Sequence, residues 1–352
     1  MRRFFSRFCC FFLPMAAIAQ PALTTADKRI AATAPDSRAV IVRDDRSVKT
    51  FVPNRQIIIK MIRRGVTSVT GQKTPKEAWL SLVSTNDVVG IKVHSRSGSV
   101  SGTRRPVVAA VVEGLLEAGL PPRQIIVWDK RSSDLQAAGY FELADEYGIR
   151  VEGSADAGYD SEVSYETPLL GKLVWGDLEF GKEGEGVGRK SFVSKLITRD
   201  ITRFISIAPL LNHYQAGVTG HIYGLALDSA DNTLRFKSSV NHLKTATPEL
   251  YAMEILGDRV ALNIVDALIC QYQGERQSLL HYSSILGELR FSRDPLALDV
   301  MSIRELEKQR RAAELPLEEP DMELYYNAGL LQIGQFDPKH VESQVIDLNE
   351  SE

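Results

Sequence analysis

The strongest constraint on the fold of this chain is a regular alternation of apolar patterns between residues 87 and 151. Three short runs rich in β-branched residues predict buried strands, at 87–93, 124–128 and 149–151. Two stretches with helical periodicity separate these runs, at 106–118 and 133–147. The β–α–β–α–β order predicts an α/β fold, with a mostly parallel sheet, right-handed crossovers and helices on both faces.

The pattern continues on both sides of this unit. Further strands are predicted at 40–42, 204–208, 260–265 and 289–291. Further helices are predicted at 54–64, 75–83, 248–256 and 294–311. Gly65 is expected to stop the first of these helices, and Pro209 is expected to end the strand at 204–208. Residues 152–200 lack periodicity, which predicts an irregular excursion with one hairpin around Leu173-Val174-Trp175.

The composition is typical of a soluble globular protein. Hydrophobic residues make up 44% and charged residues 25% of the 352 residues, which excludes a disordered chain and a polytopic membrane protein. The 42 lysines and arginines nearly balance the 45 aspartates and glutamates, so the net charge of -3 does not favour a nucleic-acid partner. Three cysteines are too few for a disulfide framework or for an iron–sulfur cluster with a full cysteine set.

The N-terminal residues have the anatomy of a secretory signal peptide. Arginines at 2, 3 and 7 precede an apolar stretch at 8–18, which ends in the small-x-small pattern Ala17-Ile18-Ala19. We expect residues 1–19 to be removed during export to the periplasm or the extracellular space, through Sec rather than the twin-arginine route. No membrane span would then remain. The alternative is an uncleaved N-terminal anchor.

The rest of the chain is expected to form one folded unit. A linker rich in alanine, threonine and proline is predicted at 20–37. A single α/β domain is predicted at 38–345, followed by an acidic tail at 346–352. No internal repeat divides the domain further.

Polar side chains follow several of the predicted strands directly. Because ligands of open parallel sheets bind beyond the carboxyl ends of the strands, we expect these side chains to line one cleft. In chain order they are Lys92, His94, Asp129, His213 and Asp266.

These residues leave two classes of function open. The first is an exported enzyme with a polar site, in which a divalent metal could assist. His94 and His213 would be metal ligands or acid–base groups, with Asp129 and Asp266 as their carboxylate partners and Lys92 as an electrostatic stabiliser. The second is an exported binding protein for an anionic small molecule, held by Lys92, by Arg96 and by the amides of the Ser/Gly loop that follows the first core strand.

Several of the same segments resemble the family called domain of unknown function 362 (DUF362). They are Asp87-Val88-Val89-Gly90-Ile91-Lys92, Leu116-Glu117-Ala118-Gly119, Ile125-Ile126-Val127-Trp128-Asp129, Ala138-Gly139-Tyr140, the stretch 209–220, Asp231-Asn232, Arg235-Phe236, Val265-Asp266 and 294–299. Together they span about residues 55–340. Within these segments Asn212, Thr219, Asn232 and Arg235 join Arg96 as candidate ligand-binding residues.

The chain also departs from the family pattern. Many relatives have Lys-Pro-Asn where this chain has Lys92-Val93-His94. Many relatives also carry a lysine shortly before the histidine of the 209–220 stretch, where this chain has Leu211 and Asn212. A Lys-Asn pair often follows the stretch in relatives, where this chain has Tyr223-Gly224. Ferredoxin-type cysteine motifs occur in some relatives but not here, so the resemblance implies neither an iron–sulfur cluster nor electron transfer. The family supplies no established reaction, substrate or cofactor.

Overall fold

The computed structural model describes residues 37–182, 186–275, 277–316 and 321–349. The predicted signal peptide, almost all of the predicted linker and the last residues of the predicted tail lie outside these ranges. Within them, no helix combines the length and the apolar character that a membrane crossing requires.

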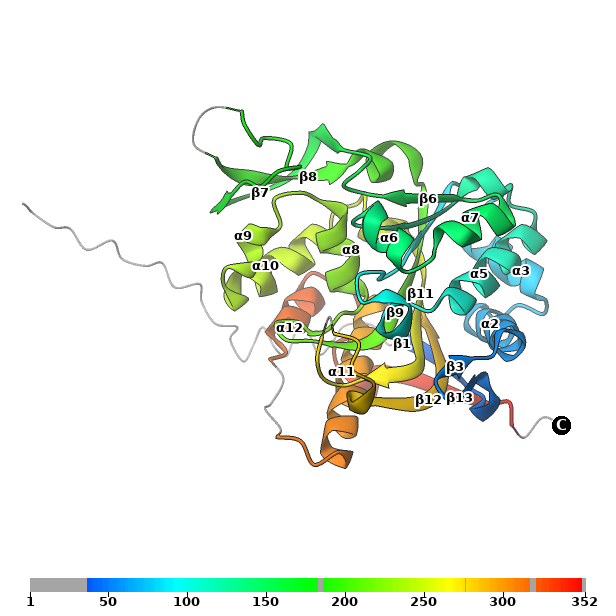
Figure 1. The fold of residues 1–352 in the computed structure, drawn as a ribbon. Helices are drawn as coiled ribbons and strands as arrows, with labels where there is room; N and C mark the ends of the chain where they lie inside the picture. The colour runs from blue at the N-terminus through cyan, green and yellow to red at the C-terminus, as the bar shows by residue number, and fades with distance from the viewer. Residues whose placement is uncertain (1–36, 183–185, 276, 317–320, 350–352) are drawn as a thin grey trace, which may run out of the picture.

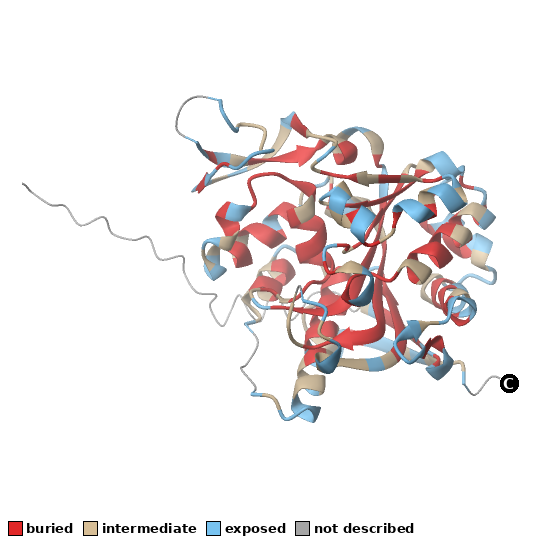
Figure 2. Ribbon diagram, viewed as in Figure 1, coloured by how far each residue is buried: buried red, intermediate tan, exposed pale blue. Residues whose placement is uncertain are grey.

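A nine-stranded sheet runs through the centre of the molecule, and Figure 2 shows its central strands buried along most of their length. The strand order is β13–β1–β12–β11–β9–β4–β5–β6, with β10 paired to β9. The strands are β1 Ser37–Arg43, β4 Val89–Lys92, β5 Ile125–Asp129, β6 Arg150–Gly153, β9 Arg203–His213, β10 Gly217–Val218, β11 Val260–Gln271, β12 Ser283–Ser292 and β13 Val341–Asp347. The run β11–β9–β4–β5–β6 is parallel throughout, and β13 is parallel to β1, whereas β12 is antiparallel to both of its neighbours. The predicted α/β fold with a mostly parallel sheet is therefore confirmed.

Helices cover both faces of this sheet (Figure 1). One group contains α2 Arg55–Thr70, α3 Pro75–Leu82, α5 Arg105–Ala118, α6 Ser132–Ala137 and α7 Phe141–Tyr147. The other contains α8 His221–Ser229, α9 Leu234–Lys237, α10 Val240–Tyr251, α11 Pro295–Ala312 and α12 Glu323–Leu330. The short helix α4 Gly98–Ser101, a small ribbon of β2 Val48–Lys49 and β3 Val52–Pro53, and several 3₁₀ turns lie outside these two groups.

Alternate residues of the strands supply the two apolar cores. On β9, Ile205 and Ile207 belong to the core under α2, α3 and α5, whereas Phe204 and Leu210 belong to the core under α8, α10 and α11. This alternation follows from the two-residue period of a strand, which points successive side chains to opposite faces. A strand that is apolar on both faces, as the sequence showed, must be covered on both.

Gly65 does not stop α2, contrary to the prediction. The helix continues to Thr70 and ends at Gly71, which has a φ of 70°. The reason for a glycine at position 65 is space, because a Cβ there would lie 2.1 Å from Cε2 of Phe291 on β12. Gly65 lets α2 approach the sheet closely.

The helix predicted at 248–256 begins eight residues earlier, at Val240, so that Pro248 lies inside α10. A proline inside a helix removes the N–H that would bond to the carbonyl four residues before it. That carbonyl belongs to Lys244, and it accepts instead a hydrogen bond from Nδ2 of Asn327 on α12, at 3.1 Å. A tertiary contact therefore replaces the missing helical bond.

Two strands run further than predicted. β9 continues through Pro209 to His213, where β10 pairs with it. β4 pairs with β9 only as far as Ser206, so the missing N–H of Pro209 faces no strand partner on that side. β11 extends to Gln271, which places Asp266 inside the strand rather than after it.

The excursion at 152–200 and the tail are more regular than predicted. β7 Tyr159–Lys172 and β8 Val187–Ser194 form a long antiparallel hairpin, followed by a π-helical turn at Leu196–Asp200. The segment around Trp175 follows β7 and leads into the turn between the two strands. At the other end of the chain, β13 carries the start of the predicted acidic tail as an edge strand beside β1.

A buried carboxylate fixes the start of α8. Oδ1 of Asp299, on α11, accepts a hydrogen bond from the backbone N–H of His221 at 2.8 Å, and Oδ2 accepts one from Ile222 at 3.0 Å. Burial raises the pKa of Asp299 to about 7, and these two N–H groups only partly oppose the shift. Asp299 is therefore a group that folding makes harder to ionise.

We predict that Asp299 makes stability fall as the pH rises. Its pKa in the folded protein lies above the ordinary value, so its stabilising contribution is complete below about pH 4 and is lost by about pH 7. In chemical denaturation, the free energy of unfolding of the wild type relative to Asp299→Asn should fall across this window, by at most about 1.4 kcal/mol per pH unit. Asp145→Asn, at an exposed position of α7, serves as the control and should show no such trend. A pH-independent difference for Asp299→Asn would contradict the assignment.

Candidate functional site

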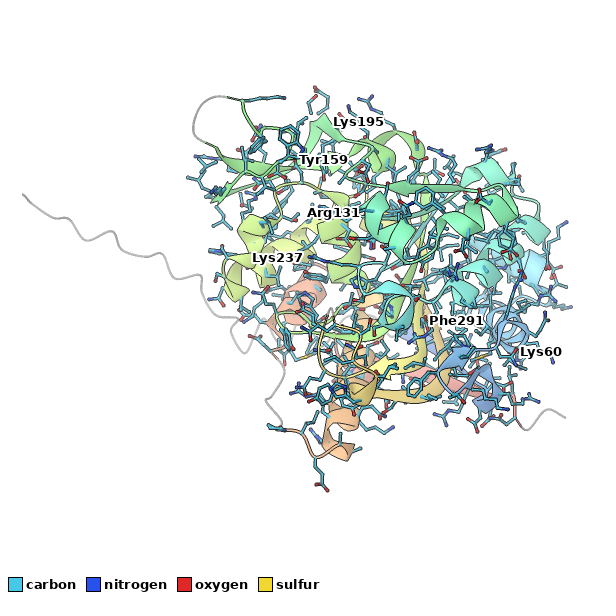
Figure 3. The ribbon with its side chains drawn as sticks, viewed as in Figure 1. Lys60, Arg131, Tyr159, Lys195, Lys237 and Phe291 are labelled. Atoms are coloured by element: carbon cyan, nitrogen blue, oxygen red, sulfur yellow. The ribbon has the colours of Figure 1, made fainter. Side chains whose placement is uncertain are left out.

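A cavity of about 620 Å³ lies beyond the carboxyl ends of β4, β5 and β9. Its walls come from the loops after these strands, from α8 and α9, and from the segment between β7 and β8. Figure 3 labels three of the lining residues, Arg131 after β5, Tyr159 at the start of β7 and Lys237 at the end of α9. This is the sheet edge at which the sequence predicted a cleft. Of the predicted site residues, the cavity is lined by His94, Arg96, Asp129, His213, Thr219 and Asn232.

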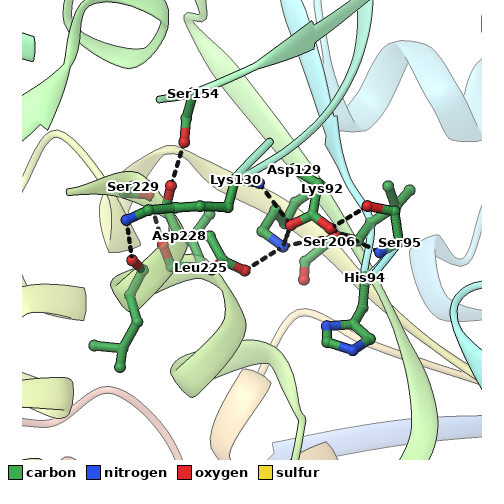
Figure 4. A network of polar contacts seen from close by, with 12 residues as sticks. Lys92, His94, Ser95, Asp129, Lys130, Ser154, Ser206, Leu225, Asp228 and Ser229 are labelled. Carbon is green, nitrogen blue, oxygen red and sulfur yellow. Dashed lines mark hydrogen bonds and ion pairs between the residues drawn. The ribbon is translucent and has the colours of Figure 1, made fainter. Parts of the chain in front are cut away.

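Lys92 lies beneath the cavity rather than on its wall. Its Nζ is 2.9 Å from Oδ1 of Asp129 and 2.9 Å from Oδ2 of Asp228, and it donates a hydrogen bond to the carbonyl of Val93 at 2.6 Å. Burial opposes the charge of the ammonium group, but the two carboxylates outweigh it and raise the pKa of Lys92. Its ammonium group is thus directed to protein acceptors (Figure 4). The predicted contact between Lys92 and a bound anion does not fit this geometry.

Both carboxylate oxygens of Asp129 also accept hydrogen bonds from the protein. Its Oδ2 accepts hydrogen bonds from the backbone N–H and the hydroxyl of Ser95, at 2.7 and 2.6 Å, and its Oδ1 accepts one from the backbone N–H of Lys130 at 2.8 Å. Burial alone would favour the protonated acid, but Lys92 and these donors hold the pKa of Asp129 well below its usual range. Asp129 therefore stays ionised and positions the loop after β4.

Lys130, which follows Asp129, connects the end of β5 to α8. Its Nζ donates to the carbonyls of Leu227, at 3.0 Å, and Ala230 at the end of that helix. Burial lowers the pKa of Lys130 to about 8. A cation at the carboxyl end of a helix is favourably placed because the last carbonyls lack helical partners.

His94 is the histidine best placed to act on a ligand. Its backbone N–H donates to Oγ1 of Thr103 at 2.9 Å, which fixes the loop, and its Nε2 lies 3.2 Å from the hydroxyl of Ser97. Burial lowers the pKa of His94, and the nearby Asp129 only partly opposes the shift. The imidazole is therefore neutral at neutral pH and can accept or relay a proton.

His213 is not the loop histidine that the sequence suggested. It is the last residue of β9 and is buried, and its Nδ1 accepts hydrogen bonds from the backbone N–H groups of Gln215 and Ala216, at 3.3 and 3.1 Å. Its Nε2 is 3.1 Å from Oε1 of Glu275. Both ring nitrogens thus have protein partners, and the ring also packs 4.2 Å from that of Tyr223. These contacts make His213 a structural part of the cavity wall.

Asp266 lies apart from the cavity, contrary to the prediction. Its carboxylate is completely buried within β11, where Oδ1 is 3.0 Å from Nη1 of Arg104 and Oδ2 accepts a hydrogen bond from the backbone N–H of Arg104 at 2.8 Å. Asp266 therefore anchors the start of α5. The error follows from the boundary of β11, which was placed six residues too early.

Asn212, Asn232 and Arg235 serve the architecture of the site. Oδ1 of Asn212 accepts a hydrogen bond from the backbone N–H of Glu275 at 2.9 Å. Nδ2 of Asn232 donates to the carbonyls of Gly188 and Lys190, and the guanidinium of Arg235 donates to carbonyls on both strands of the hairpin. These side chains hold the walls in place, and of the three only Asn232 also lines the cavity.

The predicted metal site does not fit the geometry. Among the residues that the structure describes, no three His, Cys, Asp or Glu side chains come together as metal ligands. His94 and His213 line one cavity, but the ring nitrogens of His213 already have partners. We therefore derive no chemistry through a metal.

Several cavity residues were missed by the sequence analysis. They are Lys130, Arg131, Asp134, Trp175, Tyr223, Asp228, Lys237 and Glu275. Lys130 and Arg131 directly follow Asp129 and could have been found from the same strand-end rule. Asp228 lies on α8, a helix that was not predicted, and Trp175 lies in the excursion, so neither had a usable signal.

Comparisons with known proteins leave the chain without a functional relative. No family model matches it, and no curated protein matches it. It is similar to a crystal structure of a protein from Thermotoga maritima, at 10% identity and a TM-score of 0.41. The match covers 79% of this chain and 62% of that one.

We predict that Lys92 is essential for stability. Replacement by methionine would leave the buried Asp129 and the partly exposed Asp228 without their shared cation, so Lys92→Met should lower the free energy of unfolding by about 3–5 kcal/mol. Chemical denaturation measures the change, and Lys172→Met, at an exposed position on β7, is the matched control. A loss below about 1 kcal/mol would show that the buried charges are not mutually dependent.

Proposed function

We propose that the cavity binds a small molecule through an anionic group, a phosphate or a carboxylate. The observation that carries this proposal is that two arginines at the mouth of the cavity have guanidinium groups with hydrogen-bond donors left unused by the described residues. Arg96 and Arg131 both line the cavity and are exposed. Within the described residues, neither guanidinium group forms a hydrogen bond or an ion pair. A guanidinium offers a planar fork of donors that matches a carboxylate or a phosphate.

Most carboxylates of the cavity are already committed to protein donors. Asp129 and Asp228 share Lys92, and Glu275 is paired with His213. Asp156 accepts a hydrogen bond from the backbone N–H of Ser132, and Asp177 accepts two from the backbone N–H groups of Val174 and Asn232. Each of these carboxylates therefore already accepts a donor of the protein, whereas the two guanidinium groups have donors to offer.

Asp134 is the carboxyl group that would compete with the ligand. It lines the same cavity, and both Arg96 and Arg131 act on it electrostatically. Burial raises the pKa of Asp134, and the two arginines only partly oppose the shift. A bound anion would favour the protonated form of Asp134 further, because like charges repel.

The size of the cavity agrees with a small-molecule ligand. Its volume of about 620 Å³ lies within the range of about 300–1,000 Å³ that is usual for ligand pockets. Its position beyond the carboxyl ends of parallel strands is also where such folds bind ligands.

A second candidate is an enzyme that uses His94 as an acid–base group. The observation in its favour is that His94 lines the cavity with a lowered pKa and with a hydroxyl as its only ring partner in the described part of the chain. A neutral imidazole beside a bound anion can transfer protons at neutral pH.

We also propose that the protein is exported and that it belongs to the DUF362 family. Both proposals rest on the sequence patterns described above.

We predict opposite effects on anion affinity for the arginines and for Asp134. Arg96→Gln and Arg131→Gln should each weaken the binding of inorganic phosphate by about tenfold, the effect of losing a charge-assisted hydrogen bond. Asp134→Asn should strengthen it, because a competing negative charge is removed. Isothermal titration calorimetry measures both effects. Arg123→Gln is the matched control, because Arg123 is an exposed arginine at the opposite end of β5. Unchanged affinity in both cavity arginine variants would refute the proposal.

We predict that His94 titrates below the ordinary histidine value of about 6.5. Burial is the cause, so the imidazole should remain neutral at neutral pH. Proton NMR of the histidine rings over a pH series measures this pKa, and the spectrum of His94→Gln identifies the resonance. A pKa at or above 6.5 would remove the support for a proton-transfer role.

A further inference from the structure

Trp175 is placed unusually for its residue type. It is 89% exposed, whereas the other two tryptophans, Trp79 and Trp128, are completely buried. Large aromatic side chains are rarely left in water, because burying them contributes strongly to folding. Trp175 also lines the cavity, so part of its exposed surface is accessible to a molecule bound there.

The indole is held there by a structured segment. Oδ2 of Asp177 accepts a hydrogen bond from the backbone N–H of Val174 at 2.8 Å, and Oδ1 accepts one from Asn232 at 2.9 Å. The ring of Phe180 packs edge-on against the indole, with ring centroids 5.8 Å apart and an angle of 73° between the planes. With these contacts in place the indole is still 89% exposed, so it is accessible for stacking.

The rest of the cavity wall also contains aromatic and apolar side chains. Tyr159 and Tyr223 line the cavity together with Leu211, Leu227 and Leu234. The cavity therefore combines an apolar, aromatic part with the two arginines at its mouth. A simple inorganic anion would use only the second part.

We infer that the natural ligand is an anion that carries a planar aromatic ring, and that the ring stacks on Trp175. This inference rests on the proposed function, because the anionic group is assigned to Arg96 and Arg131. Stacking suits the indole, since offset contact with another ring is favourable and needs no hydrogen-bond partner. Aromatic stacking of this kind typically changes affinity by several-fold or more when the protein side chain is removed.

The experiment compares anions with and without a ring. Phenyl phosphate is compared with inorganic phosphate, and benzoate with acetate, by calorimetric titration of the folded protein. The wild type should bind the member with the ring at least about fivefold more tightly in one of these pairs. Trp175→Ala should abolish this preference, and Trp175→Phe should restore part of it. Neither variant should change the affinity for the anions without a ring.

Leu170→Ala is the matched control, because Leu170 is an exposed apolar residue of β7 that does not line the cavity. It should leave the preference unchanged. If neither pair shows a preference for the ring, or if the preference survives in Trp175→Ala, the inference is wrong, while sensitivity of phosphate or acetate binding to Arg96→Gln would still support the proposed function. If none of the four anions binds to the wild type, both the inference and the proposed function are wrong.

Discussion

A buried ammonium group determines how the site is built. Lys92 ends β4 inside the protein, where an isolated charge would be prohibitively unfavourable. Two carboxylates make its burial possible, one from the neighbouring strand β5 and one from α8. The ion trio therefore connects the parallel core of the sheet to α8, one of the helices that cover its face. The position of α8 in turn sets where α9 and the hairpin can lie.

The charges of the cavity are divided between two tasks. Those at the floor, Lys92, Asp129 and Asp228, are satisfied by one another and by backbone groups. Those at the mouth, Arg96 and Arg131, are exposed, and their guanidinium groups form no hydrogen bond or ion pair among the described residues. The first set stabilises the fold, and the second is available for recognition. Charge identity alone could not have separated them, because burial and partner geometry make the distinction.

Much of the fold could be predicted because it depends on short-range patterns. The β-branched runs and the glycines after their helices were enough to locate β4, α5 and β5. The errors came from contacts between distant segments. Pro248 stays within a helix because Asn327 bonds to the carbonyl that the proline leaves free. Pro209 stays within a strand because β4, the neighbour on one side, no longer pairs with β9 at that position. The site was only partly predictable for the same reason. The sheet edge was correct, but Asp266 and Arg235 are used by partners that lie far away in sequence.

Arg235 holds the β7–β8 hairpin to the domain mainly through main-chain groups of the hairpin. Its guanidinium binds mainly carbonyl groups of β7 and β8, and Asn232 does the same on β8. Main-chain carbonyls are present whatever side chain a residue carries. Trp175, which lies between the two strands, can therefore be substituted without the hairpin losing these bonds to the domain. The hairpin's attachment to the domain is thus separate from the side chains that would contact a ligand, so that new specificities can evolve on an unaltered scaffold.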